Sequence, residues 1–307
     1  MGYGVPLDDA WLTGYAARLG VAAAAQARPR WVDTPSGARL AFIGGVVVKL
    51  HHHRTIPEAL AKRLAAVVDS PLADFFVTPL SPEVSRAPGG SLVTAWPAVP
   101  VLDPDGPLPW AAAGRLLARL HCAALPSALP VHGATDRVAR ALARARRLPT
   151  VTDTAAYTRA DSTTMLTRLG EALVREVTRA GTHEEPAERH TESPSVVHGD
   201  WHLGQLGRWG DGWRLLDVDD LGVGDPAWDL ARPAGFWAAG LLDEASWRTF
   251  LGAYRAAGGP AVPPAGDPWP RLDLPARCAV FVAAVRSLRG QTPAGAGAAL
   301  LHACRQM

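Results

Sequence analysis

The sequence predicts an α+β protein in which a small antiparallel sheet precedes a mainly helical part. Short apolar runs separated by turns rich in Gly and Pro occupy residues 30–50, as in a meander of strands. A proline-rich segment without periodicity covers 97–109 and is typical of a linker. Apolar residues then recur at helical spacing from 110 onward. At 307 residues the chain is long enough for two lobes, which we place at 1–96 and 110–307.

Composition excludes several classes of function. The formal net charge of +2 gives no electrostatic reason to expect a nucleic-acid partner. No segment approaches the ~20 apolar residues of a membrane span, and the N-terminus lacks the pattern of a signal peptide. The three cysteines are too few and too scattered for a disulfide framework. We therefore expect a cytoplasmic protein without a membrane or nucleic-acid partner.

The elements of the first part follow from periodicity and turn signals. Pro57 is well placed to open a helix at its first turn, and apolar residues recur at helical spacing after it. The elements expected before residue 97 are a helix over 8–28, strands over 30–34, 39–43 and 46–50, a helix over 57–68, and strands over 75–79 and 91–96.

The second part is expected to be helical apart from one hairpin. Helices are predicted over 110–120, 137–147 and 162–179, with Asp136 as the cap of the second one. The arginines of 137–147 are interpreted as a solvated helix face.

Polar residues with chemical potential gather in one short segment. Residues 198–205 read HGDWHLGQ and follow two valines that suit a buried strand. A hairpin is predicted over 206–216, because its two apolar arms flank the turn Gly-Asp-Gly at 210–212. The hairpin returns Asp217 close to the loop that precedes it.

These residues suit phosphoryl transfer. This reaction needs a divalent cation on oxygen ligands, a carboxylate base and a cation on the donor phosphates. Asp217 with the side-chain oxygen of Gln205 suits Mg²⁺, and Asp200 is free to be the base. Lys49, on a strand of the first lobe, can supply the positive charge and can pair with Glu58. Only two of the 31 Lys and Arg residues are lysines. A lysine on this strand is therefore less easily explained by chance than an arginine would be.

The two motifs in series resemble those of the aminoglycoside phosphotransferase-like kinases, which share the two-lobed protein-kinase fold. HGDWHLGQ is similar to their catalytic loop, usually HGD-x-H-x-x-N. LLDVDDLGVGDPAWDLA, at 215–231, is similar to their metal-binding segment. The lobe order extends the resemblance over nearly the whole chain, with weaker support before residue 110.

The resemblance implies a small-molecule kinase that transfers the γ-phosphate of ATP or GTP to a hydroxyl group, with Mg²⁺. It implies that Asp200 is the catalytic base and Asp217 the principal metal ligand. Lys49 and Glu58 would form the ion pair that orders the donor phosphates. The lobe 1–96 would then bind the nucleotide, and the later lobe would hold the acceptor.

Further roles rest on the resemblance alone. His198 is similar to a structural histidine that braces the two loops, and His202 would contact the transferred phosphate. Asp225 and Asp229 resemble anchors of the metal-binding loop. The segment 94–98 would be the hinge whose backbone binds the purine.

Two departures from the family pattern bear on the donor and the substrate. Gln205 replaces the usual Asn and is one methylene longer, so the metal distance or the loop must adjust. Similar His-Leu-Gly-Gln endings in bacterial maltokinases and glucosamine kinases favour a sugar or a sugar-containing acceptor, such as an aminoglycoside antibiotic. The phosphate-binding loop is abbreviated to 34–37, and the donor base is not readable.

Other candidates have two interpretations each. Asp219 and Asp220 either face the substrate or cap the following turn. Trp201 and Trp237 are either core residues or platforms for a sugar ring. The run 51–53 is all histidine, but neighbouring strand residues point to opposite faces, so we expect no metal site there.

Two alternative functions stay open. A nucleotide-binding pseudokinase without transfer activity is compatible with Gln205. A metallophosphoesterase would use the alternating His198, Asp200 and His202 as ligands, but it needs further Asp, Asn and His ligands that the sequence does not provide.

Overall fold

The computed structural model describes residues 8–21, 27–34, 37–68, 70–103, 106–148, 154–182, 194–290 and 295–307. It divides into two compact units. The first unit contains the chain up to Leu108 together with Ala123–Pro130 and Leu203–Asp219. The second contains Pro109–Cys122, Val131–His202 and the chain from Asp220 onward. The predicted lobes at 1–96 and 110–307 stay a prediction.

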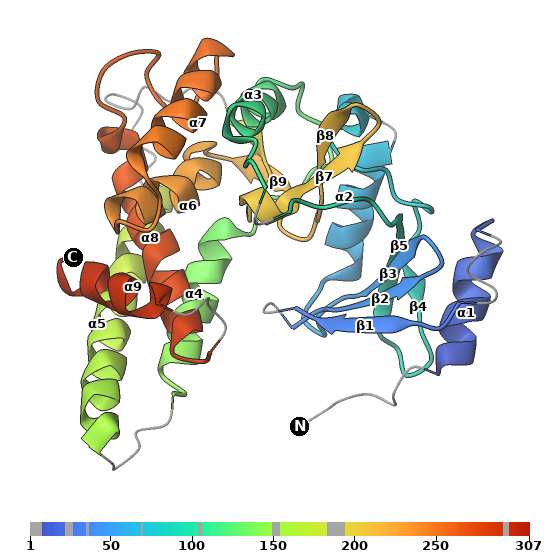
Figure 1. Ribbon diagram of the computed structural model, residues 1–307, viewed down its shortest axis with the longest axis horizontal. Coiled ribbons are helices and arrows are strands. Elements are labelled where there is room, and N and C mark those ends of the chain that lie inside the picture. The colour runs from blue at the N-terminus through green and yellow to red at the C-terminus, as the bar shows by residue number, and fades with distance from the viewer. Residues whose placement is uncertain are drawn as a thin grey trace. The chain divides into compact units, whose positions relative to one another are not determined.

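A five-stranded antiparallel sheet forms the centre of the first unit, with the strand order β1-β2-β3-β5-β4 (Figure 1). The strands are β1 (Arg30–Asp33), β2 (Arg39–Ile43), β3 (Val46–Leu50), β4 (Ser85–Arg86) and β5 (Leu92–Pro97). Alternate residues such as Ala41 and Ile43 are buried, as expected when one face of a sheet covers a core. Leu12 and Tyr15 of α1 (Asp9–Arg18) belong to that core.

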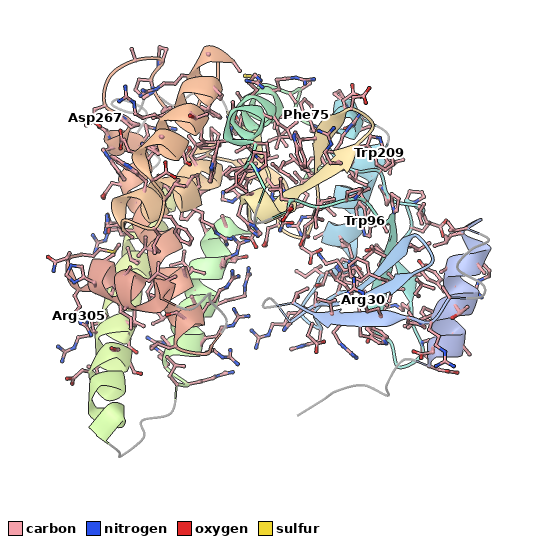
Figure 2. All side chains as sticks on the ribbon, viewed as in Figure 1. Arg30, Phe75, Trp96, Trp209, Asp267 and Arg305 are labelled. Atoms are coloured by element: carbon pink, nitrogen blue, oxygen red, sulfur yellow. The ribbon has the colours of Figure 1, made fainter. Side chains whose placement is uncertain are left out.

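A helix and a hairpin complete the first unit. Helix α2 (Pro57–Val68) buries Leu60, Leu64 and Val67, the spacing of one helical face. The hairpin consists of β7 (Leu206–Trp209) and β8 (Gly212–Leu215), and Trp209 lies near its tip (Figure 2). The remaining short elements are the 3₁₀ turns η2 (Pro71–Asp74) and η3 (Leu203–Gln205).

Backbone hydrogen bonds attach this hairpin to distant parts of the first unit. Leu215 donates its N–H to the carbonyl of Phe75 at 2.7 Å and accepts the N–H of Val77 at 3.0 Å. On the other strand, Arg208 donates to the carbonyl of Pro100 at 2.8 Å. The chain leaving β8 therefore starts from a position fixed by residues more than a hundred positions earlier.

The second unit is helical apart from one pair of short strands. Helix α8 packs against α4, α5, α6 and α9, while α3 packs against α7. Phe281 of α8 is fully buried and belongs to the main core of this unit. Its elements are α3 (Trp110–His121), α4 (Ala134–Ala145), α5 (Thr154–Thr182), β6 (Ser195–Val197), β9 (Gly222–Gly224), α6 (Ala227–Ala238), α7 (Glu244–Ala256), α8 (Trp269–Ser287) and α9 (Ala296–Arg305).

The predicted fold class is confirmed, with several local corrections. The first helix ends at Arg18, not at residue 28, and residues 22–26 lie outside the described residues. The strand expected over 75–79 is reduced to a bridge at Phe76, because that segment pairs with only one residue of β8. Asp136 is not a cap, since α4 already begins at Ala134. No helix in the described ranges is long and apolar enough to span a membrane.

Two glycines in neighbouring helices give a matched test of the packing of α3 on α7. A Cβ atom on Gly114 of α3 would lie 2.4 Å from the carbonyl oxygen of Phe250 and 3.0 Å from the nitrogen of Tyr254, whereas a Cβ on Gly252 of α7 would meet nothing within 4 Å. We expect Gly114→Ala to lower the free energy of unfolding by about 1–3 kcal/mol through overpacking. Gly252→Ala should raise it by about 1 kcal/mol through helix propensity. Urea unfolding followed by circular dichroism measures both, and equal effects would contradict the close approach of the two helices.

Candidate active site

The loop that carries Asp200 begins at the end of a short strand pair in the second unit. Strand β6 pairs with β9 so that Val197 lies opposite Gly222. The chain then turns at Gly199, which has a φ of +83°. A Cβ atom on Gly199 would lie 2.3 Å from the carbonyl oxygen of Asp220. The glycine of the motif is therefore required both by backbone conformation and by space.

A fully buried carboxylate, Asp229, binds the backbone of this loop. Its two oxygens accept the backbone N–H groups of His198 at 2.7 Å and Gly199 at 2.8 Å. His121 of α3 lies 3.0 Å from the same carboxylate through Nε2, and its Nδ1 lies 2.7 Å from the Tyr254 hydroxyl. Burial raises the pKa of Asp229, but His121 and His198 outweigh this effect and keep the pKa below its ordinary value. This arrangement agrees with an anchoring role for Asp229.

In the first unit, the ammonium group of Lys49 meets two carboxylates that follow the hairpin. Lys49 lies on the central strand β3, between Leu40 of β2 and Thr94 of β5. Its Nζ is 2.7 Å from Oδ1 of Asp217 and 2.8 Å from Oδ2 of Asp219. The packing of the hairpin brings Lys49 and Asp217, which are 168 positions apart in the sequence, within hydrogen-bond distance. We call Lys49, His51, Asp217 and Asp219 the lysine–aspartate cluster.

Burial makes the electrostatics of this cluster strong. The side chain of Lys49 is 10 % exposed. Its burial lowers the ammonium pKa, but the charges of Asp217 and Asp219 outweigh that effect and raise the pKa above the ordinary value. Burial likewise raises the pKa of Asp219, whereas Lys49 and His51 hold it well below its usual range. Lys49 and Asp219 are therefore both ionised near neutral pH.

His51 is a structural partner within the cluster. Its Nδ1 lies 3.1 Å from Asp219 and its Nε2 lies 2.8 Å from the hydroxyl of Thr94. The expectation that the run 51–53 forms no metal site stays a prediction. The predicted hinge at 94–98 stays a prediction. In the predicted phosphate loop, Pro35 and Ser36 lie outside the described residues.

The oxygen groups of the first unit fit a magnesium ion. Asp217 adopts a φ of +62°, a left-handed conformation that Asp tolerates better than most residues. Its carboxylate is 34 % exposed. Gln205 is close along the hairpin, because its carbonyl accepts the N–H of Leu216 at 2.8 Å. Two carboxylates face one ammonium group here, so a surplus negative charge and hard oxygen ligands remain for a divalent cation.

The predicted ion pair between Lys49 and Glu58 is not formed. Glu58 lies in the first turn of α2 and is exposed. Among the described residues, the ion-pair partners of Lys49 are Asp217 and Asp219. The two carboxylates already compensate the charge of the buried ammonium group, so the fold does not require Glu58 for this purpose. A role of Glu58 toward a nucleotide stays a prediction.

In the second unit, Asp200 is bound by two arginines. Its Oδ1 lies 2.6 Å from Arg137 of α4 and 3.1 Å from Arg232 of α6. Burial raises the pKa of Asp200, but the two guanidinium groups outweigh it and hold the pKa well below the usual range. The carboxylate is therefore ionised throughout the physiological pH range.

Asp220 belongs to the same group of charges. It forms an ion pair with Arg137, lies 3.7 Å from Arg140, and accepts the N–H of Gly133 through its carbonyl. The expectation that the arginines of 137–147 form a solvated face is thus wrong for Arg137, whose side chain is only 13 % exposed. Helical periodicity shows which residues share a face but not which charged residue meets a partner from another helix.

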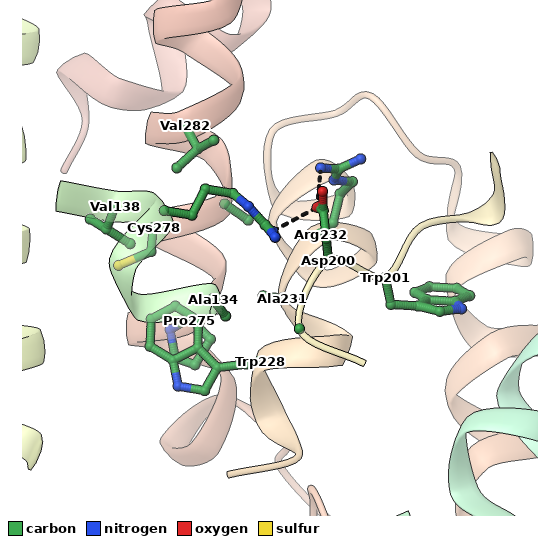
Figure 3. Close-up of a pocket in the computed structure, with 13 residues that line it drawn as sticks. Ala134, Val138, Asp200, Trp201, Trp228, Ala231, Arg232, Pro275, Cys278 and Val282 are labelled. Atoms are coloured by element: carbon green, nitrogen blue, oxygen red, sulfur yellow. Dashed lines mark hydrogen bonds and ion pairs between the residues drawn. The ribbon is translucent and has the colours of Figure 1, made fainter. Parts of the chain in front are cut away.

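His202 and Trp201 follow Asp200 in the same loop and are both close to it in sequence. Burial, followed by the charge of Arg232, lowers the pKa of His202 to about 3, so its ring is neutral at pH 7. Trp201 is 3 % exposed and stacks on Phe250 with ring centroids 5.1 Å apart. In Figure 3 it lies away from Trp228, on the other side of Asp200. Of the two interpretations of Trp201, this burial and stacking favour a core residue over a platform for a sugar ring.

Sequence reasoning missed several residues around Asp200. Arg232 directly follows the second motif, and Arg286 lies on α8, far from either motif. Their charges act on Asp200. Adjacency to the motif was the only available signal for Arg232, and none existed for Arg286. His121 was missed as well, since nothing in the sequence relates it to Asp229.

The anchoring of the loop by Asp229 gives a stability test. We expect Asp229→Ala to lower the free energy of unfolding by about 3–5 kcal/mol, because it leaves buried N–H groups and His121 without their partner. Asp225→Ala is the control. In the described ranges this half-exposed carboxylate accepts the N–H of Ala227 and a hydrogen bond from Arg271, and its loss should cost about 1 kcal/mol.

The pH dependence has a defined sign. The pKa of Asp229 in the folded protein is lowered, so its stabilising effect is complete above the unfolded value of about 4 and is lost as the pH falls further. Lowering the pH below about 4 should therefore reduce the difference in the free energy of unfolding between the unaltered protein and Asp229→Ala. A difference that widens below pH 4 would contradict this assignment.

Comparison with known proteins agrees with this geometry. The model of the APH family, described as the phosphotransferase enzyme family, matches residues 79–272, more than half of the chain. A search of curated protein sequences finds no match.

Solved structures of low sequence identity share the fold. Choline kinase from Cryptosporidium parvum Iowa II aligns with a TM-score of 0.57 at 10 % identity, covering 97 % of this chain and 93 % of that one. Choline kinase LicA from Streptococcus pneumoniae gives 0.53 at 12 % identity and 88 % of both chains. A putative fructosamine-3-kinase from Haemophilus somnus 129PT gives 0.51 at 11 % identity, covering 91 % and 90 %. Together with the match to the family model, these findings confirm the family and the kinase-like fold predicted from the motifs: the chain belongs to the APH phosphotransferase family and is a small-molecule phosphotransferase.

Proposed function

We propose that this phosphotransferase transfers the γ-phosphate of ATP or GTP to a hydroxyl group of a small molecule, with Asp200 as the base. The observation that carries the proposal is the approach of Lys49 to Asp217, 2.7 Å apart although they come from opposite halves of the chain. A buried cation beside carboxylates that suit Mg²⁺ is the arrangement needed to bind nucleoside triphosphate. Related solved structures support this donor class, since one spectinomycin phosphotransferase holds AMP and has a TM-score of 0.50 at 12 % identity.

The proposed reaction is a direct transfer between two oxygens. The acceptor hydroxyl oxygen forms a bond to the γ-phosphorus, while the bond from that phosphorus to the β–γ bridging oxygen breaks. The hydroxyl proton goes to Asp200, and the nucleoside diphosphate leaves. Asp200 stays ionised because Arg137 and Arg232 stabilise its charge. His202 is neutral near pH 7 and can donate a hydrogen bond to a phosphate oxygen.

Asp217 and Gln205 would hold Mg²⁺, and Lys49 would contact the donor phosphates. The ion would supply charge neutralisation on the phosphate oxygens. Lys49 already lies between two carboxylates, so it is positioned before a nucleotide binds and loses little entropy on binding. Asp219 keeps the ammonium group oriented from the other side.

Loss of the base should abolish turnover but not nucleotide binding. We expect Asp200→Asn to lower kcat by roughly 10²–10⁴-fold, the usual contribution of a general base. Release of nucleoside diphosphate is measured with a panel of sugars, aminoglycosides and hydroxy acids as acceptors. The affinity for nucleotide, measured by calorimetry, should stay the same. Nucleotide binding without transfer to any acceptor would identify a pseudokinase, and turnover that survives Asp200→Asn would contradict the assigned base.

The metal assignment has a separate readout. We expect Asp217→Asn to raise the Mg²⁺ concentration needed for thermal stabilisation by nucleotide, roughly ten- to hundredfold. Asp211→Asn is the matched control, because this carboxylate lies at the exposed tip of the same hairpin. An unchanged Mg²⁺ requirement in Asp217→Asn would show that the ion is held elsewhere.

A further inference from the structure

The charges around Asp200 do not balance within the second unit. In the described part of the chain, four arginines lie close enough to act on one another and on two carboxylates, a group that we call the arginine–aspartate cluster. They come from three helices that pack together around α8. The members are Arg137 and Arg140 of α4, Arg232 of α6, Arg286 of α8, Asp200 and Asp220. The surplus is two positive charges in a region of low exposure.

Arg286 is the member with the fewest partners. Its Nε atom is buried and has no hydrogen-bond partner among the described residues. No ion pair involving it is found in the described part of the chain, although the charges of Asp200 and Asp220 act on it. A buried N–H that points away from any acceptor is costly unless a ligand satisfies it.

The arginines repel one another. Burial, and then the charges of Arg286 and Arg137, lower the pKa of Arg232 to about 10 even though Asp200 opposes the change. The pKa of Arg286 is lowered in the same direction by burial and by Arg137. An anion placed among these groups relieves the repulsion, and a cation increases it.

A pocket opens beside this charge. Arg137, Arg232 and Asp200 line it together with an apolar wall that includes Trp228, and all of its lining belongs to the second unit. In Figure 3, Trp228, Pro275, Cys278 and Val282 lie on one side of Asp200, and Trp201 lies on the other. The pocket therefore offers guanidinium forks, an apolar surface and the proposed base to one small molecule.

We infer that the acceptor carries an anionic group, a carboxylate or a phosphate, close to the hydroxyl that is phosphorylated. Guanidinium groups bind such anions through paired hydrogen bonds. The arginines that bind Asp200 would also bind the anionic group of the acceptor. One carboxylate oxygen of Asp200 would then be available to the acceptor hydroxyl. The charge of the cluster favours small hydroxy acids, sugar acids and sugar phosphates, whereas a polycationic aminoglycoside would be repelled. This inference rests on the proposed function for the reaction and on the arginine–aspartate cluster for the acceptor.

Binding of small probes tests the inference without any need for turnover. Malonate and inorganic phosphate are titrated into the full chain by calorimetry at constant ionic strength, with neutral malonamide for comparison. We expect both anions to bind and malonamide not to bind. Arg286→Gln should weaken malonate binding about tenfold, and Arg289→Gln, an exposed arginine just beyond α8, should leave it unchanged. Arg286→Lys, which keeps the charge, should give an intermediate affinity. It keeps the test valid if Arg286→Gln does not fold.

The outcomes separate this inference from the proposed function. Malonate that fails to bind, or that binds equally to Arg286→Gln, overturns it. Phosphate binding without malonate binding, or a loss of nucleotide affinity in Arg286→Gln, assigns the arginines to the donor phosphate and also overturns it. In turnover assays, glucuronate and glucose 6-phosphate should be preferred over glucose, and glucosamine should be the poorest of the four. Anion binding at Arg286 without transfer to any acceptor would instead contradict the proposed function and leave the anion site in place.

Discussion

The ion pairs of Lys49 with Asp217 and Asp219 are the interaction on which the first unit depends. They join the central strand of its sheet to the chain that leaves the β7–β8 hairpin. A buried ammonium group is tolerated only when carboxylates compensate it, so sheet and hairpin must meet at this place. The same requirement leaves one carboxylate charge in excess, and this excess makes the cluster suitable for a metal-bound phosphate donor.

The second unit has the opposite charge balance. The carboxylate of Asp200 is held by arginines, and the loop that carries Asp200 is held by the buried Asp229. Asp229 supports the backbone, while Arg137 and Arg232 control the charge of Asp200. The position and the ionisation of Asp200 are thus determined by different residues. In the reaction that we propose, the surplus of guanidinium groups would orient an acceptor through its anionic group and would disfavour cationic acceptors.

Some candidate residues of both units could be predicted because they are close in sequence. Asp200, Gln205 and Asp217 stand in two motifs joined by a hairpin, and turn chemistry alone predicts that the hairpin returns the chain. The sheet meander was readable for the same reason, since neighbouring strands form it. Glu58 illustrates where the inference stopped: its position in the first turn of a helix was predicted correctly, but its pairing with Lys49 was not, because two other carboxylates already occupy the ammonium group.

The sequence by itself determined the family, the order of sheet and helices, and the residues with catalytic potential, because local periodicity and motif spacing record these properties directly. Only the tertiary structure decided which charges meet. Arg137, Arg232 and Arg286 come from three helices, and their convergence on Asp200 depends on how these helices pack around α8. Helix packing is set by the shapes of many side chains at once, so no single stretch of sequence predicts it.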